Sequence, residues 1–181
     1  MYKRQQSDLA RSIEVSSPTI KDYIEIANGS YVWRSLNSFE RNVKKQIAKM
    51  PKGHIRDSGL LHHLLKIASI EQLETHPILG RSFEGFIVEE ILKGLESSNF
   101  ASWSAHHYRT RAKSEIDLII DNKFGSIPIE VKYSSKIQTK QLKTIKDFIK
   151  DHKSPFGLLA NNSDSIEIVG ERLYQIPATC L

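Results

Sequence analysis

Residues 115–135 of the 181-residue chain are EIDLIIDNKFGSIPIEVKYSS, and this stretch decides the fold. Two runs rich in isoleucine and valine flank the turn-like NKFGS, so the pattern predicts two adjacent strands of a core hairpin. Strand alternation places Glu115, Asp117, Ile119 and Asp121 on one face of the first strand and Ile116, Leu118 and Ile120 on the other. In the second strand Glu130 and Lys132 share a face. Charged side chains are rarely buried unless they are paired or bind a cation, so we expect these acids to be paired or to bind a cation.

Asp117 and Glu130 lie on neighbouring predicted strands, so their carboxylates can approach closely. Adjacent carboxylates raise each other's pKa, which is unfavourable unless a cation lies between them. Hard oxygen ligands suit Mg²⁺, with Mn²⁺ as the other candidate. Lys132 follows Glu130 at about 7 Å along the strand, where an ammonium can orient a water or stabilise charge on a phosphate. The composition is that expected of metal-assisted phosphodiester hydrolysis.

The sequence RSFEGFIVEEILKGLES, residues 81–97, predicts an amphipathic helix. At about 100° per residue its apolar side chains fall on one arc, and Glu84 lies near the centre of that arc. Glu89, Lys93 and Glu96 lie on the opposite side and are predicted to face solvent. Glu84 can therefore reach the acids of the hairpin as a further ligand or base. The alternative is that Glu84 is an ordinary first-turn acid of the helix.

After the hairpin, residues 136–152 predict a second amphipathic helix with one apolar stripe. Its lysines recur on the other side at spacings of three and four: Lys136, Lys140, Lys143, Lys146, Lys150 and Lys153. They form either an ordinary solvated face or a ridge that tracks DNA phosphates. FGLLANN and SIEIVGERLYQIP then predict two closing strands.

Residues 1–45 form a separate predicted unit that contains SDLARSIEVSSPTIKDYIEIA. Ser7 begins one short helix, and Ser17 with Pro18 begins a second as its N-cap and first helical residue. The pair matches helix-turn-helix geometry, with YVWRSL as a candidate wing strand. The alternative is a helix pair that serves only for packing. Including this unit, the predicted DNA contacts are Thr19, Lys21, Arg109, Arg111, Lys136, Lys140 and Lys143.

Residues 46–56 contain Pro51 and Gly53 and predict a linker that runs into a strand or turn and leads to a second domain, residues 57–181. Lysine and arginine total 26 against 21 acids, a mild excess compatible with DNA as partner. The single cysteine excludes an internal disulfide, and no secretory segment is visible, which predicts a cytoplasmic protein. No apolar run approaches the ~20 residues of a membrane span. The oligomeric state does not follow from the sequence.

Asp117 followed by Glu130-Val131-Lys132 resembles the motif of the PD-(D/E)XK restriction-endonuclease-like superfamily, although SEID stands where the motif has PD. Glu84 matches the superfamily's common extra carboxylate. The resemblance implies an α/β fold in residues 57–181, a restriction-endonuclease-like mixed sheet flanked by helices. It also implies that Asp117 and Glu130 bind Mg²⁺, that Lys132 positions the attacking water and that Glu84 assists.

Nearly the whole chain resembles the C-terminal region of bacterial and archaeal AAA-class ATPases, where a winged helix and a nuclease-like domain follow a P-loop ATPase domain. The blocks that carry this resemblance include LARSIEVSSPTIKDYIEIA, KKQIAKMPKGHIRDSGLLHHLL and HPILGRSFEGFIVEEIL. No GxxxxGK[ST] occurs, so the chain is expected to have no ATP site and no ATPase activity. The resemblance implies a fragment, split gene product or remnant of such an ATPase, with a P-loop ATPase as partner.

Three functions remain open from the sequence. The first is a Mg²⁺-dependent DNA endonuclease. The second is a non-catalytic module that binds DNA or a protein through the nuclease-like fold, since members of the superfamily often lose catalysis. The third is an accessory domain of an ATPase with no independent role.

Overall fold

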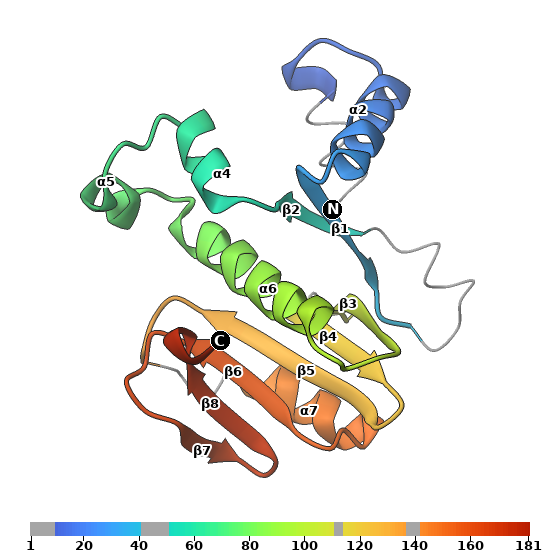
Figure 1. Cartoon of the computed structure of the whole chain (residues 1–181), viewed down its shortest axis with the longest axis vertical. Coiled ribbons are helices and arrows are strands. Elements are labelled where there is room, and N and C mark those ends of the chain that lie inside the picture. The colour runs from blue at the N-terminus through green and yellow to red at the C-terminus, as the bar shows by residue number, and fades with distance from the viewer. Residues whose placement is uncertain (1–9, 41–50, 111–113, 137–141) are drawn as a thin grey trace.

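The computed structural model describes residues 10–40, 51–110, 114–136 and 142–181 (Figure 1). The helices are α2 (Ser17–Gly29), α4 (Ser58–Leu64), α5 (Ile70–Thr75), α6 (Leu79–Ser97), α7 (Lys143–His152) and the short 3-10 helix η2 (Ala178–Cys180). The strands are β1 (Trp33–Ser38), β2 (Lys52–Ile55), β3 (Trp103–Arg109), β4 (Glu115–Asn122), β5 (Gly125–Lys132), β6 (Gly157–Asn161), β7 (Glu167–Gly170) and β8 (Leu173–Pro177). None of the described helices is long and apolar enough to cross a membrane.

The described strands form one eight-stranded mixed sheet in the order β2-β1-β3-β4-β5-β6-β8-β7. The strands β3, β4 and β5 run antiparallel to their neighbours in this group, whereas β5, β6 and β8 are mutually parallel. In Figure 1, α6 crosses the front of the sheet and α7 lies behind it. The predicted mixed α/β architecture, with helices flanking the sheet, is confirmed.

Helices α6 and α7 are held by separate apolar layers, one on each face of β4 and β5. On one face, Ile145, Phe148 and Ile149 of α7 pack in a cluster that includes Ile116 and Ile119 of β4. On the other face, a cluster joins α6 to the same strands through Val88, Leu92, Leu118, Ile120 and Ile129. The apolar stripes predicted for both helices therefore face the core, and the hairpin lies between them.

Strand β4 departs from the strict alternation that the sequence predicts. Ile116 and Ile119 pack in the same cluster, so the prediction that Ile119 shares a face with Asp117 is wrong. Between these two isoleucines, Asp117 and Leu118 lie opposite the single residue His107 of β3. Two residues against one is a β-bulge, which bends the strand and re-aims its side chains. The bulge falls on the predicted catalytic aspartate.

The N-terminal elements differ from expectation in two details. Ser16, rather than Ser17, is the N-cap of α2, where its hydroxyl accepts a hydrogen bond from the Thr19 backbone N–H. Strand β1 pairs antiparallel with β2 and parallel with β3, so this unit extends the main sheet. The predicted start of the first helix, Ser7, lies outside the described residues.

We expect Ile119→Ala to destabilise the fold by about 2–5 kcal/mol, because it opens a cavity in a fully buried cluster. Ile168→Ala on β7 is the control: Ile168 is 78% exposed, so its loss should change the free energy of unfolding by less than about 0.5 kcal/mol. Urea denaturation measures both. Equal losses in the two variants would contradict the assignment of the core.

Candidate functional site

Glu84 of α6 and Asp117 of β4 meet at a lysine that the motif does not contain. Nζ of Lys52, the first residue of β2, lies 2.5 Å from Oε1 of Glu84 and 2.9 Å from Oδ1 of Asp117. The other oxygen of Asp117 accepts the backbone N–H of Val131 at 3.0 Å. Both carboxylate oxygens of Asp117 therefore already have a donor.

The position of Glu84 in α6 excludes the alternative that it is an ordinary first-turn acid of the helix. Helix α6 begins at Leu79, two residues before the predicted start, and its first turn carries no acid. Glu84 therefore lies beyond the first turn, and a favourable place at the helix N-terminus does not account for it. Its contact with Lys52 beside Asp117 does account for it.

Glu130 and Lys132 form the second ion pair of the site, within strand β5. Nζ of Lys132 lies 2.6 Å from Oε1 of Glu130. Ile129 and Val131 pack with residues of α6. Alternation along the strand gives Glu130 and Lys132 a shared face, as the sequence predicts, and the charge of Asp117 acts on both.

Asp117 acts electrostatically on both ion pairs, Lys52–Glu84 and Lys132–Glu130. Burial raises the pKa of Glu84, and the charge of Asp117 raises it further, against the opposing effect of Lys52. Burial and Asp117 likewise raise the pKa of Glu130 to about 7, against Lys132. Burial disfavours the ammonium of Lys52, yet the charges of Asp117 and Glu84 outweigh burial and raise its pKa. Asp117 is thus the neighbour that Glu84 and Glu130 share.

The four residues predicted to be catalytic, Glu84, Asp117, Glu130 and Lys132, are therefore brought into one neighbourhood, but they are arranged as pairs. Within the described parts of the chain, no three His, Cys, Asp or Glu side chains are placed to hold one metal ion. Lysine ammonium groups supply the positive charge instead. A divalent ion bound to the same oxygens of Glu84 and Asp117 would have to replace Lys52, so the site as described does not fit Mg²⁺ or Mn²⁺.

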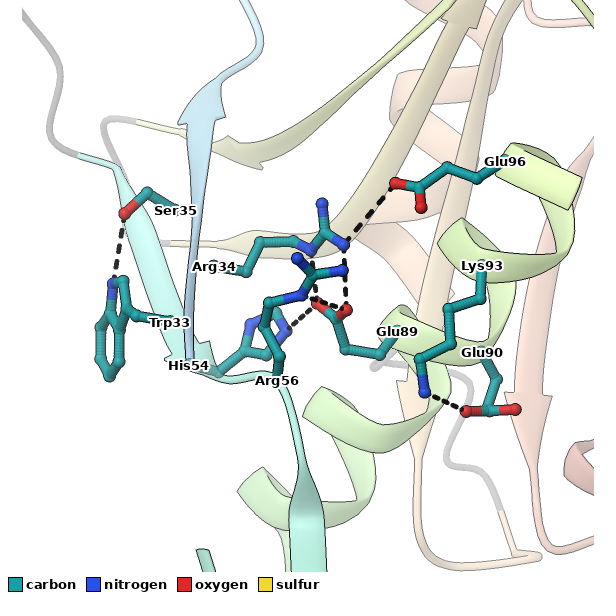
Figure 2. Close-up of polar contacts among 9 residues, drawn as sticks. All are labelled: Trp33, Arg34, Ser35, His54, Arg56, Glu89, Glu90, Lys93 and Glu96. Atoms are coloured by element: carbon teal, nitrogen blue, oxygen red, sulfur yellow. Dashed lines mark hydrogen bonds and ion pairs between the residues drawn. The ribbon is translucent and has the colours of Figure 1, made fainter. Parts of the chain in front are cut away.

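A second charged cluster, drawn in Figure 2, is built on Glu89 of α6, which is 1% exposed. Its carboxylate accepts hydrogen bonds from Nε and Nη2 of Arg34, the latter at 2.9 Å, and from Nε of Arg56 at 3.0 Å. Nε2 of His54 lies 3.1 Å from it. The prediction that Glu89 faces solvent is wrong, because basic residues from β1, β2 and the position just after β2 cover it. We call these four residues the Glu89 clamp.

The clamp keeps Glu89 ionised. Burial disfavours the charged form, but the hydrogen bonds from His54 and Arg34, with further help from Arg56, outweigh burial and lower the pKa of Glu89 to about 2. Since this buried carboxylate binds Arg34 of β1, His54 of β2 and Arg56 just after β2, the clamp fixes β1 and β2 against α6.

Lys52 and the Glu89 clamp were both missed by the sequence analysis, although a signal was present. Lys52, His54 and Arg56 alternate in KGHIRD, so they share one face of an extended segment. A side chain at Gly53 would collide with the ring of Trp33, so glycine is needed where β2 pairs with β1. Three basic residues at alternate positions indicate a strand over an acidic partner, and the linker prediction did not use this periodicity.

The predicted DNA contacts are spread over the molecule. Lys21 on α2 is exposed, and its Nζ lies 3.4 Å from Oε1 of Glu25. Nζ of Lys143 on α7 lies 2.6 Å from Oδ2 of Asp147. These two helices are well apart in Figure 1, so their lysines do not form one surface. The other contacts are Thr19, half-buried on α2; Arg109, 3.0 Å from Glu115; Lys136, exposed; and Arg111 and Lys140, which lie outside the described residues.

A mixed α/β domain with a buried cluster of acids and lysines at its central strands is the class of protein that the fold and site define. The chain belongs to the family described as Domain of unknown function (DUF4143), which matches residues 79–181. Residues 3–71 match a further family, Domain of unknown function (DUF8612). The first match therefore contains the acids of the site (Glu84, Asp117 and Glu130), together with Glu89 and Lys132. The second match contains Lys52.

Two curated proteins are similar to this chain. They are Uncharacterized protein Mb2031c of Mycobacterium bovis and Uncharacterized protein Rv2008c of Mycobacterium tuberculosis, each 34% identical over 129 residues. The similarity covers 71% of this chain but 28% of each relative. The chain thus spans less than a third of the length of these relatives.

We expect Glu89→Gln to cost about 3 kcal/mol of folding stability, because it leaves Arg34 and Arg56 beside a neutral amide in a buried place. Glu90→Gln is the matched control, since Glu90 is the next residue of α6 and only makes an exposed pair with Lys93. Urea denaturation at pH 7 compares the two. A loss in Glu89→Gln no larger than that in Glu90→Gln would contradict the clamp.

The same pair of proteins gives a pH test. The pKa of Glu89 falls from its ordinary 4.5 to about 2 on folding, so its stabilisation is fully present above pH 4.5 and is lost as the pH falls through about 2. The stability difference between the wild type and Glu89→Gln should therefore shrink between pH 4.5 and pH 2. Denaturation curves over this range measure it, and a difference independent of pH would exclude the lowered pKa.

Proposed function

We propose that this chain is a PD-(D/E)XK nuclease-like domain that interacts with DNA and comes from the C-terminal region of an AAA-class ATPase. The observation that supports the proposal is the surroundings of Asp117 on β4: it shares Lys52 with Glu84 of α6, and its charge acts on Glu130 and Lys132 of β5. The order of elements supports it as well: a helix with an acid, three antiparallel strands and a helix on the opposite face. A restriction-endonuclease-like sheet has this order.

The proposed chemistry belongs to an open form of the site, with Lys52 withdrawn. Asp117 and Glu130 would then be the oxygen ligands of Mg²⁺ or Mn²⁺, which accepts one or two carboxylates together with waters and substrate phosphate oxygens. Lys132 would orient the attacking water or stabilise charge on the phosphate, and Glu84 would assist. Because Lys52 occupies the described site, we assign no hydrolytic step to that form.

A second candidate is a non-catalytic module that binds DNA or a protein, and the pairing of each acid with a lysine favours it. The surface between α2 and β1 suits such a role: a hollow of about 390 Å³ there is lined by Tyr31, Trp33, Arg34 and Arg56 among others. Aromatic rings at such a surface can stack on bases, and Tyr31 is 76% exposed. The proposed winged-helix role of α2 and the β1–β2 pair, with Lys21 on its outer face, belongs here.

The proposed partner is a P-loop ATPase, because the chain itself has no phosphate-binding loop of the form GxxxxGK[ST]. Copurification with such an ATPase, from cells that express both, would support this part of the proposal. A chain that copurifies with none would limit the proposal to DNA.

For the wild type we expect binding to a fluorescent DNA duplex that weakens as salt rises, and nicking of supercoiled plasmid that requires Mg²⁺ or Mn²⁺. Asp117→Ala and Lys132→Ala should abolish nicking, because each removes a proposed catalytic group. Lys93→Ala, an exposed change on α6, should leave both readouts unchanged. Fluorescence anisotropy and agarose gels provide the measurements.

The binding and nicking assays distinguish the two candidate functions. Binding without nicking in any protein would support the non-catalytic candidate. Nicking that survives in both alanine variants would identify a contaminating nuclease. Absence of binding at low salt would contradict a role on DNA.

A further inference from the structure

We infer that Lys52 is a built-in counter-ion that occupies the cation position between Glu84 and Asp117 and competes with a divalent metal for it. This inference deepens the proposed function, on whose acid site it rests, by naming what keeps that site closed. It adds to the site a residue from the N-terminal part of the chain, outside the D…ExK motif.

The contacts of Lys52 are those of a bound cation. Its Nζ bridges two carboxylates from different elements, at 2.5 Å and 2.9 Å. The side chains are partly or largely withdrawn from water, with 28% of Lys52, 24% of Glu84 and 8% of Asp117 exposed. Charge-assisted hydrogen bonds are strong, and they are screened little when water is excluded.

The acids need such a cation. The charge of Asp117 disfavours the charged form of Glu84, and a positive charge between the two acids opposes this effect. Either an ammonium or a divalent ion can supply it, but not both at the same oxygens. Mg²⁺ requires oxygens at about 2.0–2.1 Å in a near-octahedral arrangement, and the ammonium of Lys52 would repel a divalent ion bound to the oxygens that it contacts.

Lys132 does not have this role. It pairs with Glu130, two residues before it on the same strand, and so stays within the motif. Lys52 instead arrives from β2, an edge strand that pairs with β1. The site therefore holds one lysine expected from the motif and one additional lysine that closes it.

The Glu89 clamp explains why Lys52 stays in place. His54 and Arg56 follow Lys52 at alternate positions, and both contact the buried carboxylate of Glu89. Lys52 can leave the acids by rotation of its own side chain or by release of β2 from the clamp. Opening of the site is thus coupled to the docking of the β1–β2 pair on α6.

The test is Mn²⁺ binding to the full chain, measured by calorimetry and by electron paramagnetic resonance. Lys52→Met keeps the aliphatic stem and removes the charge, so it should bind Mn²⁺ roughly tenfold tighter than the wild type or more. Lys93→Met, which removes an exposed lysine of α6, should bind as the wild type does. Adding Asp117→Asn to Lys52→Met should remove the gain.

Equal Mn²⁺ affinities of the wild type and Lys52→Met would overturn the inference. If the wild type nicks DNA in that case, the proposed function stands without it. If Lys52→Met gains Mn²⁺ but neither protein ever nicks DNA, hydrolysis fails as a function while the role of Lys52 stands.

Acylation of lysines in the wild type, followed by mass spectrometry, gives a test that does not depend on the folding of a variant. Saturating Mn²⁺ should displace Lys52 from the acids and speed its acylation, with Lys93 as the internal reference. Acylation of Lys52 that Mn²⁺ leaves unchanged would overturn the inference.

Discussion

The buried carboxylate of Glu89 is the interaction on which the arrangement of this protein depends. One acid on α6, almost fully withdrawn from water, collects Arg34 from β1, His54 from β2 and Arg56 just beyond it. Removing one partner from such a cluster leaves uncompensated charge in a place that water cannot reach. The cluster therefore fixes the β1–β2 pair on the helix that carries Glu84, and Lys52 is placed as a consequence.

The acid site is consequently a joint product of two parts of the chain. Its acids and Lys132 lie in the region that matches one family, whereas Lys52 lies in the region that matches the other. Asp117 links them, because it contacts Lys52 directly and its charge also acts on Glu130. The bulge at Asp117 and Leu118 lies at this junction, where a regular strand would have directed the side chains differently.

The sequence predicts the parts of the fold that depend on local patterns. Strands β4, β5 and β6 and the apolar faces of α6 and α7 follow from periodicity, and so does the position of Glu84 among apolar residues. The prediction that SIEIVGERLYQIP forms one closing strand is wrong, because this segment turns back on itself and forms the antiparallel strands β7 and β8. The bulge in β4 was not predictable, because it depends on the register between two strands and not on either strand alone. The site residues identified by the motif stay predictions in their catalytic roles.

Glu89 and Lys52 show why sequence periodicity was insufficient. Glu89 lies opposite the apolar arc of its helix, which normally faces solvent, yet here a second strand pair covers that side. Whether a polar helix face is covered depends on a segment far away in sequence. The alternation of Lys52, His54 and Arg56 indicated a strand, but its partner could not be inferred without the pairing of β2 with β1.

The central claim is that an internal ammonium fills the place of a metal ion in the acid site. A crystal structure of the metal-free protein at neutral pH tests it most directly. The claim predicts Nζ of Lys52 within hydrogen-bond distance of both Glu84 and Asp117. A Lys52 side chain directed into solvent, with waters or an ion between the two acids, would contradict it.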